Sequence, residues 1–136
     1  MAVAVVAAAV LQRWTAARAA PAPTGGAGTV PAGVRRADFT RPDAPWLVVL
    51  FSSKGCESCR GTWSKVEPLA SDAVAVADVA WQTGGDLHRR YGIEAVPTVL
   101  VVDAEGEVRA SFVGPPTATD LWAAVADARA ADPPAP

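Results

Sequence analysis

The chain has 136 residues, which fits one domain with flanking tails and excludes a multidomain enzyme or a large α/β barrel. A hydrophobic fraction of 51% and a charged fraction of 19% are typical of a globular protein. Residues 1–36 carry a charge of +4 and residues 37–136 a charge of −6, which gives the net charge of −2. The acidic larger part argues against nucleic acid as a partner, because phosphate binding needs a basic face.

Residues 1–15 are distinct from the rest because they begin with an apolar run. The run covers residues 2–11, only ten residues, whereas a bilayer span needs about 20. Three interpretations stay open: a truncated membrane anchor, a signal-like segment, and an Ala-rich tail. We expect membrane association through residues 1–11, on a side that the sequence does not define; an exported or a cytoplasmic soluble protein is the alternative.

The rest of the chain divides by composition. Residues 16–45 are rich in Ala, Pro and Gly and lack apolar periodicity, which predicts a flexible linker. Within it, residues 34–43 are a candidate for one short element packed against the domain. We predict that residues 46–131 form the folded domain and that residues 132–136 form a disordered tail.

The domain opens with a continuous apolar run at residues 46–51, the pattern of a strand buried on both faces. Periodicity, glycines and prolines then predict further elements. In chain order these are a helix at 59–67, a strand at 74–81, a short helix at 86–91, a hairpin of strands at 98–102 and 107–113, and a helix at 117–129. A βαβ half followed by a ββα half predicts an α/β fold, a mixed sheet with helices on both faces.

The most informative motif is Cys56-Glu57-Ser58-Cys59, which holds both cysteines of the chain. It lies where a buried strand gives way to a helix, so Cys56 faces the unpaired amides and dipole of the helix N-terminus, which favour the thiolate. Cys59 is close enough to form a disulfide with it. The pair can therefore attack a substrate disulfide, form a mixed disulfide and release it by internal attack.

Other interpretations of the pair stay open. A structural disulfide is one, although so short a loop restrains the unfolded chain least. A soft-metal clamp such as a Cu(I) site between chains is another. Only three Cys or His side chains exist, counting His88, too few for a four-ligand zinc site in one chain. We predict no metal site and no cofactor, and expect His88 to be a solvent-facing helix residue.

Two segments carry a family resemblance. Residues 47–60, LVVLFSSKGCESCR, resemble the active-site segment of the thioredoxin family. Residues 91–100, YGIEAVPTVL, followed by a turn at 103–107 and by Gly114, resemble a second segment of that family. The resemblance covers about residues 46–129. It implies a thioredoxin fold and protein thiols or disulfides as partners, with an upstream electron donor or acceptor that stays unknown.

The resemblance also implies roles for individual residues. It implies that Cys56 is the cysteine that attacks the substrate disulfide and that Cys59 is the one that resolves the mixed disulfide. Val96 and Pro97 are implied to form a cis peptide opposite the dithiol, which leaves the Val96 backbone open to pair with an extended substrate.

The chain departs from the family pattern around the motif. Gly55 stands where the family usually has Trp, which leaves Cys56 more open to substrate. Glu57 opposes thiolate formation by like-charge repulsion, whereas Ser58 can donate a hydrogen bond to sulfur. Leu50 stands where the family has a buried Asp, so deprotonation of Cys59 falls to water or another base such as Glu57. Lys54 is the nearest cation in sequence and a candidate to tune the Cys56 thiol.

These observations favour a thiol–disulfide oxidoreductase of the thioredoxin class, with Cys56 and Cys59 as its reactive groups. The alternative is a non-catalytic module on the same fold that binds a soft metal or a partner protein.

Overall fold

The computed structural model describes residues 30–131. Four strands form one sheet in the order β2-β1-β3-β4. They are β1 (Trp46–Ser52), β2 (Val74–Ala80), β3 (Thr98–Val102) and β4 (Val108–Val113). β1 runs parallel to β2 and antiparallel to β3, and β3 runs antiparallel to β4. The predicted α/β class with a mixed sheet is confirmed.

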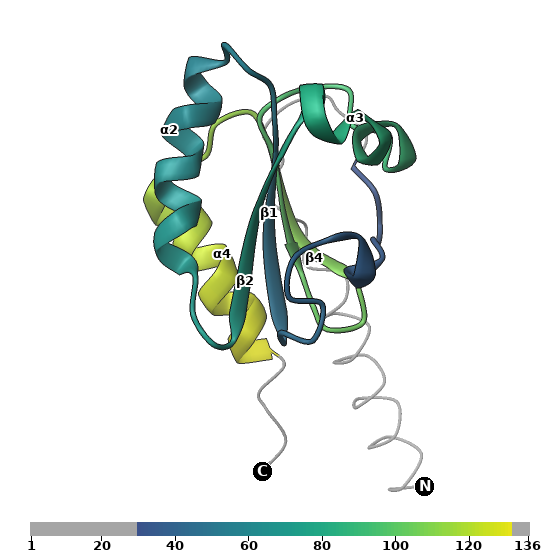
Figure 1. The fold of residues 1–136 in the computed structure, drawn as a ribbon. Helices are drawn as coiled ribbons and strands as arrows, with labels where there is room; N and C mark the ends of the chain where they lie inside the picture. Colours follow the sequence, from purple (N-terminus) through teal and green to yellow (C-terminus); the bar gives the residue numbers. More distant parts are fainter. Residues whose placement is uncertain (1–29, 132–136) are drawn as a thin grey trace, which may run out of the picture.

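Helices cover both faces of this sheet (Figure 1). α2 (Glu57–Val66) and α4 (Ala118–Ala131) lie on one face, and α3 (Trp81–Arg90) lies on the other. Two short 3₁₀ helices, η1 (Arg36–Asp38) and η2 (Glu67–Leu69), complete the described part. α3 begins before the predicted residue 86, but Gly84 inside it has non-helical angles, which explains why periodicity showed only its second half.

The core explains why β1 is apolar throughout. Every residue of β1 is buried, and alternate side chains enter two separate clusters. Val48 and Leu50 pack with residues of α2 and α4, whereas Leu47 and Phe51 pack with residues of α3 and of the segment before β1. A strand with a core on each face cannot alternate apolar with polar residues.

Residues 33–44, within the predicted linker 16–45, pack on the α3 face of the sheet. Val34, Phe39 and Ala44 are buried there. The buried Arg36 guanidinium donates to the backbone carbonyls of Asp103 (3.1 Å) and Arg41 (3.2 Å). The folded unit therefore begins by residue 33 rather than 46, because a few spaced apolar residues bury against strands distant in sequence.

The predicted N-terminal segment 1–15, the first part of the linker and the tail 132–136 lie outside the described residues. Within residues 30–131, no helix combines the length and the apolar character needed to cross a bilayer. Membrane association through residues 1–11 stays a prediction.

Candidate redox site

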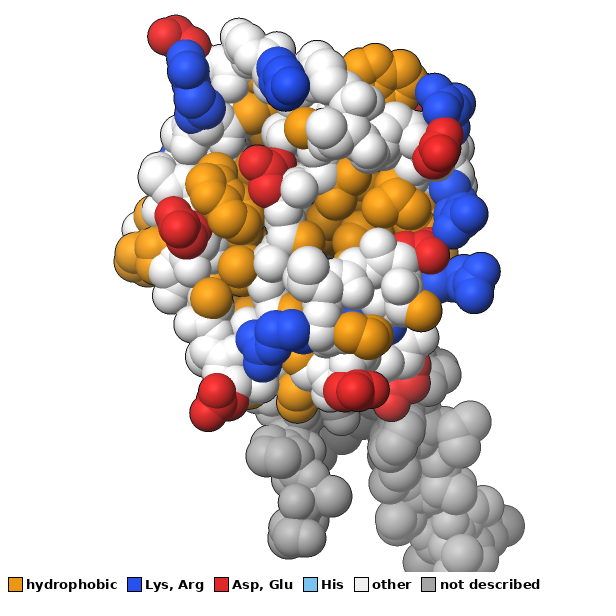
Figure 2. Space-filling model, viewed as in Figure 1, with side chains coloured by type: hydrophobic (Ala, Val, Ile, Leu, Met, Phe, Trp, Pro, Cys, Tyr) orange, Lys and Arg blue, Asp and Glu red, His pale blue; other side chains and the backbone are white. Residues whose placement is uncertain are grey.

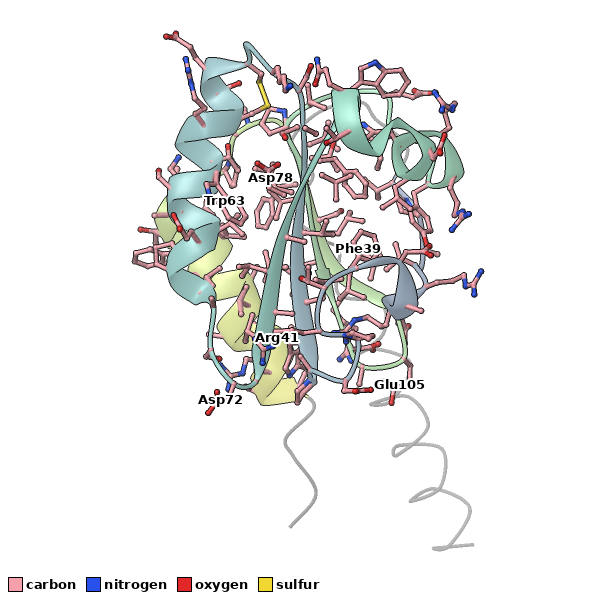
Figure 3. All side chains as sticks on the ribbon, in the orientation of Figure 1. Phe39, Arg41, Trp63, Asp72, Asp78 and Glu105 are labelled. Atoms are coloured by element: carbon pink, nitrogen blue, oxygen red, sulfur yellow. A yellow bond between two sulfur atoms is a disulfide. The ribbon has the colours of Figure 1, made fainter. Side chains whose placement is uncertain are left out.

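The two cysteines lie at the junction of β1 and α2, as predicted. The chain leaves β1 at Ser52 and turns at Gly55, and the Cys56 amide donates to the Ser53 carbonyl at 3.3 Å. Cys56 is the N-cap of α2, and it forms a disulfide with Cys59 across a Cα–Cα distance of 5.2 Å. Figure 3 shows this bond in yellow at the end of the sheet where α2 begins. The pair is therefore placed to cycle between dithiol and disulfide.

Hydrogen-bond donors converge on the sulfur of Cys56. The Cys59 backbone amide donates to Cys56 Sγ at 3.2 Å. The Ser58 hydroxyl lies 3.5 Å from the same sulfur, and it must be the donor because a disulfide sulfur carries no proton. Together with the N-terminal dipole of α2, these donors favour negative charge on Cys56 once the disulfide is reduced.

The two sulfur-bearing residues differ in exposure. Cys56 is partly exposed, whereas Cys59 is buried at 3% exposure. A partner can therefore approach Cys56 directly, while Cys59 is shielded from bulk solvent.

The charged neighbours of the motif face outward. The Glu57 side chain is 92% exposed and lies 3.8 Å from the Arg60 guanidinium. Solvent screens so exposed a carboxylate, which weakens the repulsion expected between Glu57 and a Cys56 thiolate. Lys54 is exposed, and its backbone amide donates to the Gln82 side chain of α3 at 3.0 Å. This bond fixes the loop at 53–55, which we call the active loop, against α3.

Residues of α2, of the edge strand β2 and of the loop between β1 and α2 line an open cavity of about 530 Å³. We call it the α2–β2 cavity; its lining residues are Ser52, Ser53, Lys54, Gly55, Cys59, Arg60, Trp63, Asp78 and Ala80. Figure 2 shows an acidic group at the surface on this side of the molecule, among uncharged and apolar side chains. Cys59 thus reaches the cavity although it is almost covered from outside.

Sequence reasoning missed Asp78. The Ser52 hydroxyl donates to its Oδ1 at 2.5 Å, and the β1–β2 register places Asp78 beside Leu50. The available signal was a single acid in the strand sequence VAVADVA, at a position that shares its face with Val74 and Val76. Only the register shows that this acid lies next to Leu50, at an exposed position of the edge strand on the α2 side of the sheet.

Val96 and Pro97 lie at the same end of the sheet as the cysteines, because Phe51 of β1 pairs with Thr98, the first residue of β3. The peptide bond between them is cis. The Pro97 carbonyl accepts from the Gly114 amide at 2.8 Å. Within residues 30–131, the Val96 backbone makes no hydrogen bond, so its amide and carbonyl are open to another chain.

The solvent-facing position predicted for His88 is wrong. His88 is 2% exposed, and its Nε2 lies 2.8 Å from the Val79 carbonyl. Its ring packs edge-to-face on Phe51 and Trp81. Phe51 belongs to the α3-side cluster, so His88 lies across the sheet from the α2–β2 cavity.

No protein-family model and no curated protein matches the chain. Solved structures do. Thioredoxin from Fasciola hepatica is 28% identical, with 62% of this chain and 82% of that chain covered, at a TM-score of 0.54. A mutant thioredoxin from Halobacterium salinarum NRC-1 is 22% identical, with 82% and 100% covered, at a TM-score of 0.60. Oxidized mitochondrial thioredoxin 3 from Saccharomyces cerevisiae is 19% identical, with 63% of this chain and 81% of that chain covered, at a TM-score of 0.54.

The chain is a thioredoxin-fold protein with a Cys-x-x-Cys pair at the start of the helix after the central strand. That pair is consistent with the thioredoxin family, and the predicted resemblance is confirmed at the level of fold and cysteine pair. Fold and pair together support a thiol–disulfide oxidoreductase.

Proposed function

We propose that the protein exchanges disulfides with a protein partner through a mixed disulfide on Cys56, which Cys59 then resolves. The observation that carries this proposal is the asymmetry of the pair. Cys56 is accessible and surrounded by donors, whereas Cys59 is buried and already within bonding distance. An accessible sulfur stabilised as the thiolate suits attack on a partner, and a shielded neighbour suits the internal second step.

The reaction balances as a two-electron exchange. In the reductive direction the Cys56 thiolate attacks one sulfur of the partner's disulfide, and the other sulfur leaves as a thiolate. Cys59 loses its proton and attacks Cys56, so the mixed disulfide breaks and the partner's second thiolate leaves. The protein's dithiol is oxidised and the partner's disulfide is reduced; the reverse sequence oxidises a dithiol partner.

The surroundings of the pair support an extended peptide as the substrate. The Val96 backbone is unpaired at the same end of the sheet as Pro97 and the cysteines. A Cβ at Gly55 would meet no heavy atom within 4 Å, so nothing among the described residues covers the loop at that point. Strand-like pairing with Val96 would present a partner's disulfide to Cys56.

Serine substitutions of the two cysteines test the proposal with a disulfide-bonded test protein such as insulin. Cys56→Ser should reduce turnover to the uncatalysed rate, because no nucleophile reaches the substrate. Cys59→Ser keeps that nucleophile and should accumulate a covalent complex, visible by mass spectrometry and lost on adding dithiothreitol. Full activity in both variants would show that the cysteines do not carry the reaction.

The soft-metal alternative gains no further ligand from the fold. His88, the only histidine, is buried on the opposite side of the sheet from the cavity. Among residues 30–131, no group of three or more His, Cys, Asp or Glu is placed to hold a metal ion. The pair would have to share a metal with a second chain, and we favour disulfide exchange.

A further inference from the structure

The resolving step needs a route for the proton of Cys59. A thiol shielded from water resists ionisation, and only the thiolate attacks a disulfide. Cys59 is 3% exposed, and the open space that it lines is the α2–β2 cavity. The cavity of about 530 Å³ is open to solvent and has room for water, which needs about 30 Å³ per molecule. Its wall is mostly apolar, and Ser52, Ser53 and Asp78 provide polar partners for that water.

Asp78 is the one carboxylate among the residues that line this cavity. Alternate residues of β2, Val74 and Val76, face the cluster under α2, so Asp78 faces the same way. Figure 3 shows its side chain directed toward α2, below the disulfide. Its position on the neighbouring strand brings an acid to the space beside Leu50, where β1 itself offers none.

Ser52 orients this carboxylate. Ser52 is 5% exposed, and its hydroxyl bond to Asp78 Oδ1 at 2.5 Å leaves the second carboxylate oxygen for the cavity. The other charged groups in the wall are cationic, Lys54 from the active loop and Arg60 from α2. Both favour negative charge in the cavity, whether it is on the carboxylate or on the sulfur of Cys59.

We propose that Asp78, oriented by Ser52, accepts the proton of Cys59 through cavity water during the resolving step. This inference rests on the proposed disulfide exchange. The Cys59 proton passes through water to the carboxylate, and the electron pair stays on sulfur. The thiolate then attacks Cys56 Sγ, the Cys59–Cys56 bond forms, the Cys56–substrate bond breaks, and the leaving thiolate takes a proton from solvent.

A reagent with two visible steps isolates this proton transfer. The reduced full chain is mixed with dithiobis(nitrobenzoic acid), a disulfide whose released thiol is yellow. The first release reports the mixed disulfide on Cys56, and the second reports attack by Cys59. Asp78→Asn keeps the size and the acceptor oxygen for Ser52 but cannot take a proton at neutral pH.

We expect Asp78→Asn to leave the first release unchanged and to slow the second about 100-fold near pH 7, the lower end of what general acid–base catalysis contributes. The rate should recover as the pH is raised into the alkaline range, because hydroxide in the open cavity can then take the Cys59 proton without the carboxylate. Ser52→Ala should slow the second release less, because the carboxylate remains but loses its orienting bond.

Asp72→Asn is the matched control, since it removes the same charge at the opposite end of β2 (Figure 3) and should change neither release. A second release equal to wild type at every pH, or an equal loss at neutral and alkaline pH, would overturn the role of Asp78 alone. Absence of a second release in the wild-type chain would overturn the proposed exchange and this inference together.

Discussion

At the scale of a single residue, Gly55 determines the backbone path of the loop at 53–55 that leads to Cys56. Its φ is +80°, in the left-handed region that a Cβ disfavours. A Cβ there would meet no heavy atom within 4 Å, so the constraint is backbone conformation and not space. Gly61 offers the complementary case, because it is equally open but lies inside α2.

Alanine at these two glycines should therefore have opposite effects. Gly55→Ala should lower the free energy of unfolding by about 1–2 kcal/mol, the cost of a left-handed backbone with a Cβ. Gly61→Ala should raise it by about 0.8–1 kcal/mol, the difference in helix propensity. Urea unfolding of the oxidised protein measures both, and a shift of the same sign in both variants would contradict the argument.

Residues whose environment is local were predictable from sequence, and residues placed by tertiary contacts were not. Cys56 at a helix N-terminus and Ser58 two residues on follow from a strand-to-helix junction. Asp78 acquires its position from the β1–β2 register, and His88 its burial from the packing of α3 on the sheet. Neither relation is encoded within the few residues around those positions.

At the scale of an element, the segment before β1 (residues 33–44) packs against the turn between β3 and β4. The Val34 amide donates to the Gly106 carbonyl at 2.7 Å, and the Val108 amide donates to the Ala32 carbonyl at 3.0 Å. Gly106 has a φ of +86°, and a Cβ there would lie 2.0 Å from the Val34 carbonyl oxygen. The segment can approach this closely only because residue 106 is glycine.

Gly106→Ala should release this segment, and Gly114→Ala is its control. Gly114 has a φ of +93° but would meet no heavy atom within 4 Å, so its substitution should cost only the backbone strain of about 1–2 kcal/mol. Gly106→Ala adds the clash, so we expect a larger loss of stability and faster hydrogen exchange at the Val34 amide. Protection of that amide equal to the control variant would contradict the docking argument.

Elements with their own apolar pattern were predictable with their bounds, whereas the docked segment was predicted only as one candidate short element at 34–43 inside a linker. β3 has the predicted bounds, because five consecutive apolar or β-branched residues leave little choice. The segment at 33–44 has Pro, Gly and charged residues between its few apolar ones, which is also the composition of a linker. Its structure depends on the sheet that it covers, and no local pattern reports that sheet.

At the scale of the whole molecule, polar contacts join the segment before β1 to the end of α3. The Asp38 carboxylate accepts from the Tyr91 hydroxyl and from Arg90 Nη1 (2.8 Å), and Tyr91 Oη accepts from the Arg35 amide at 3.0 Å. The Tyr91 hydrogen bond, with a further contribution from Arg90, lowers the pKa of Asp38. Burial, followed by the Asp38 bond, raises the pKa of Tyr91.

These shifts predict how stability depends on pH. An Asp38 pKa below its usual value means that the unfolded chain binds more protons near pH 4, so stability rises with pH there. The contribution is fully present above the unfolded pKa and is lost as pH falls through the folded one. The raised pKa of Tyr91 has the opposite sign: its contribution is present below a pH of about 10 and is lost above it.

Asp38→Asn should therefore destabilise the protein in a pH-dependent way. The Asp38 side chain is only 14% exposed, so solvent screens its bonds little, and charged hydrogen bonds contribute about 1.5–3 kcal/mol. We expect the variant to lose about 1–2 kcal/mol of unfolding free energy at pH 7, and this loss to shrink as the pH falls below the ordinary Asp pKa and through the lowered pKa of folded Asp38. Urea unfolding at several pH values measures the difference.

Asp127→Asn on the exposed side of α4 is the control, because it removes the same charge and should give a difference that changes little with pH. A loss of equal size at pH 3 and pH 7 for Asp38→Asn would assign its effect to packing and not to the charged contacts that join η1 to α3.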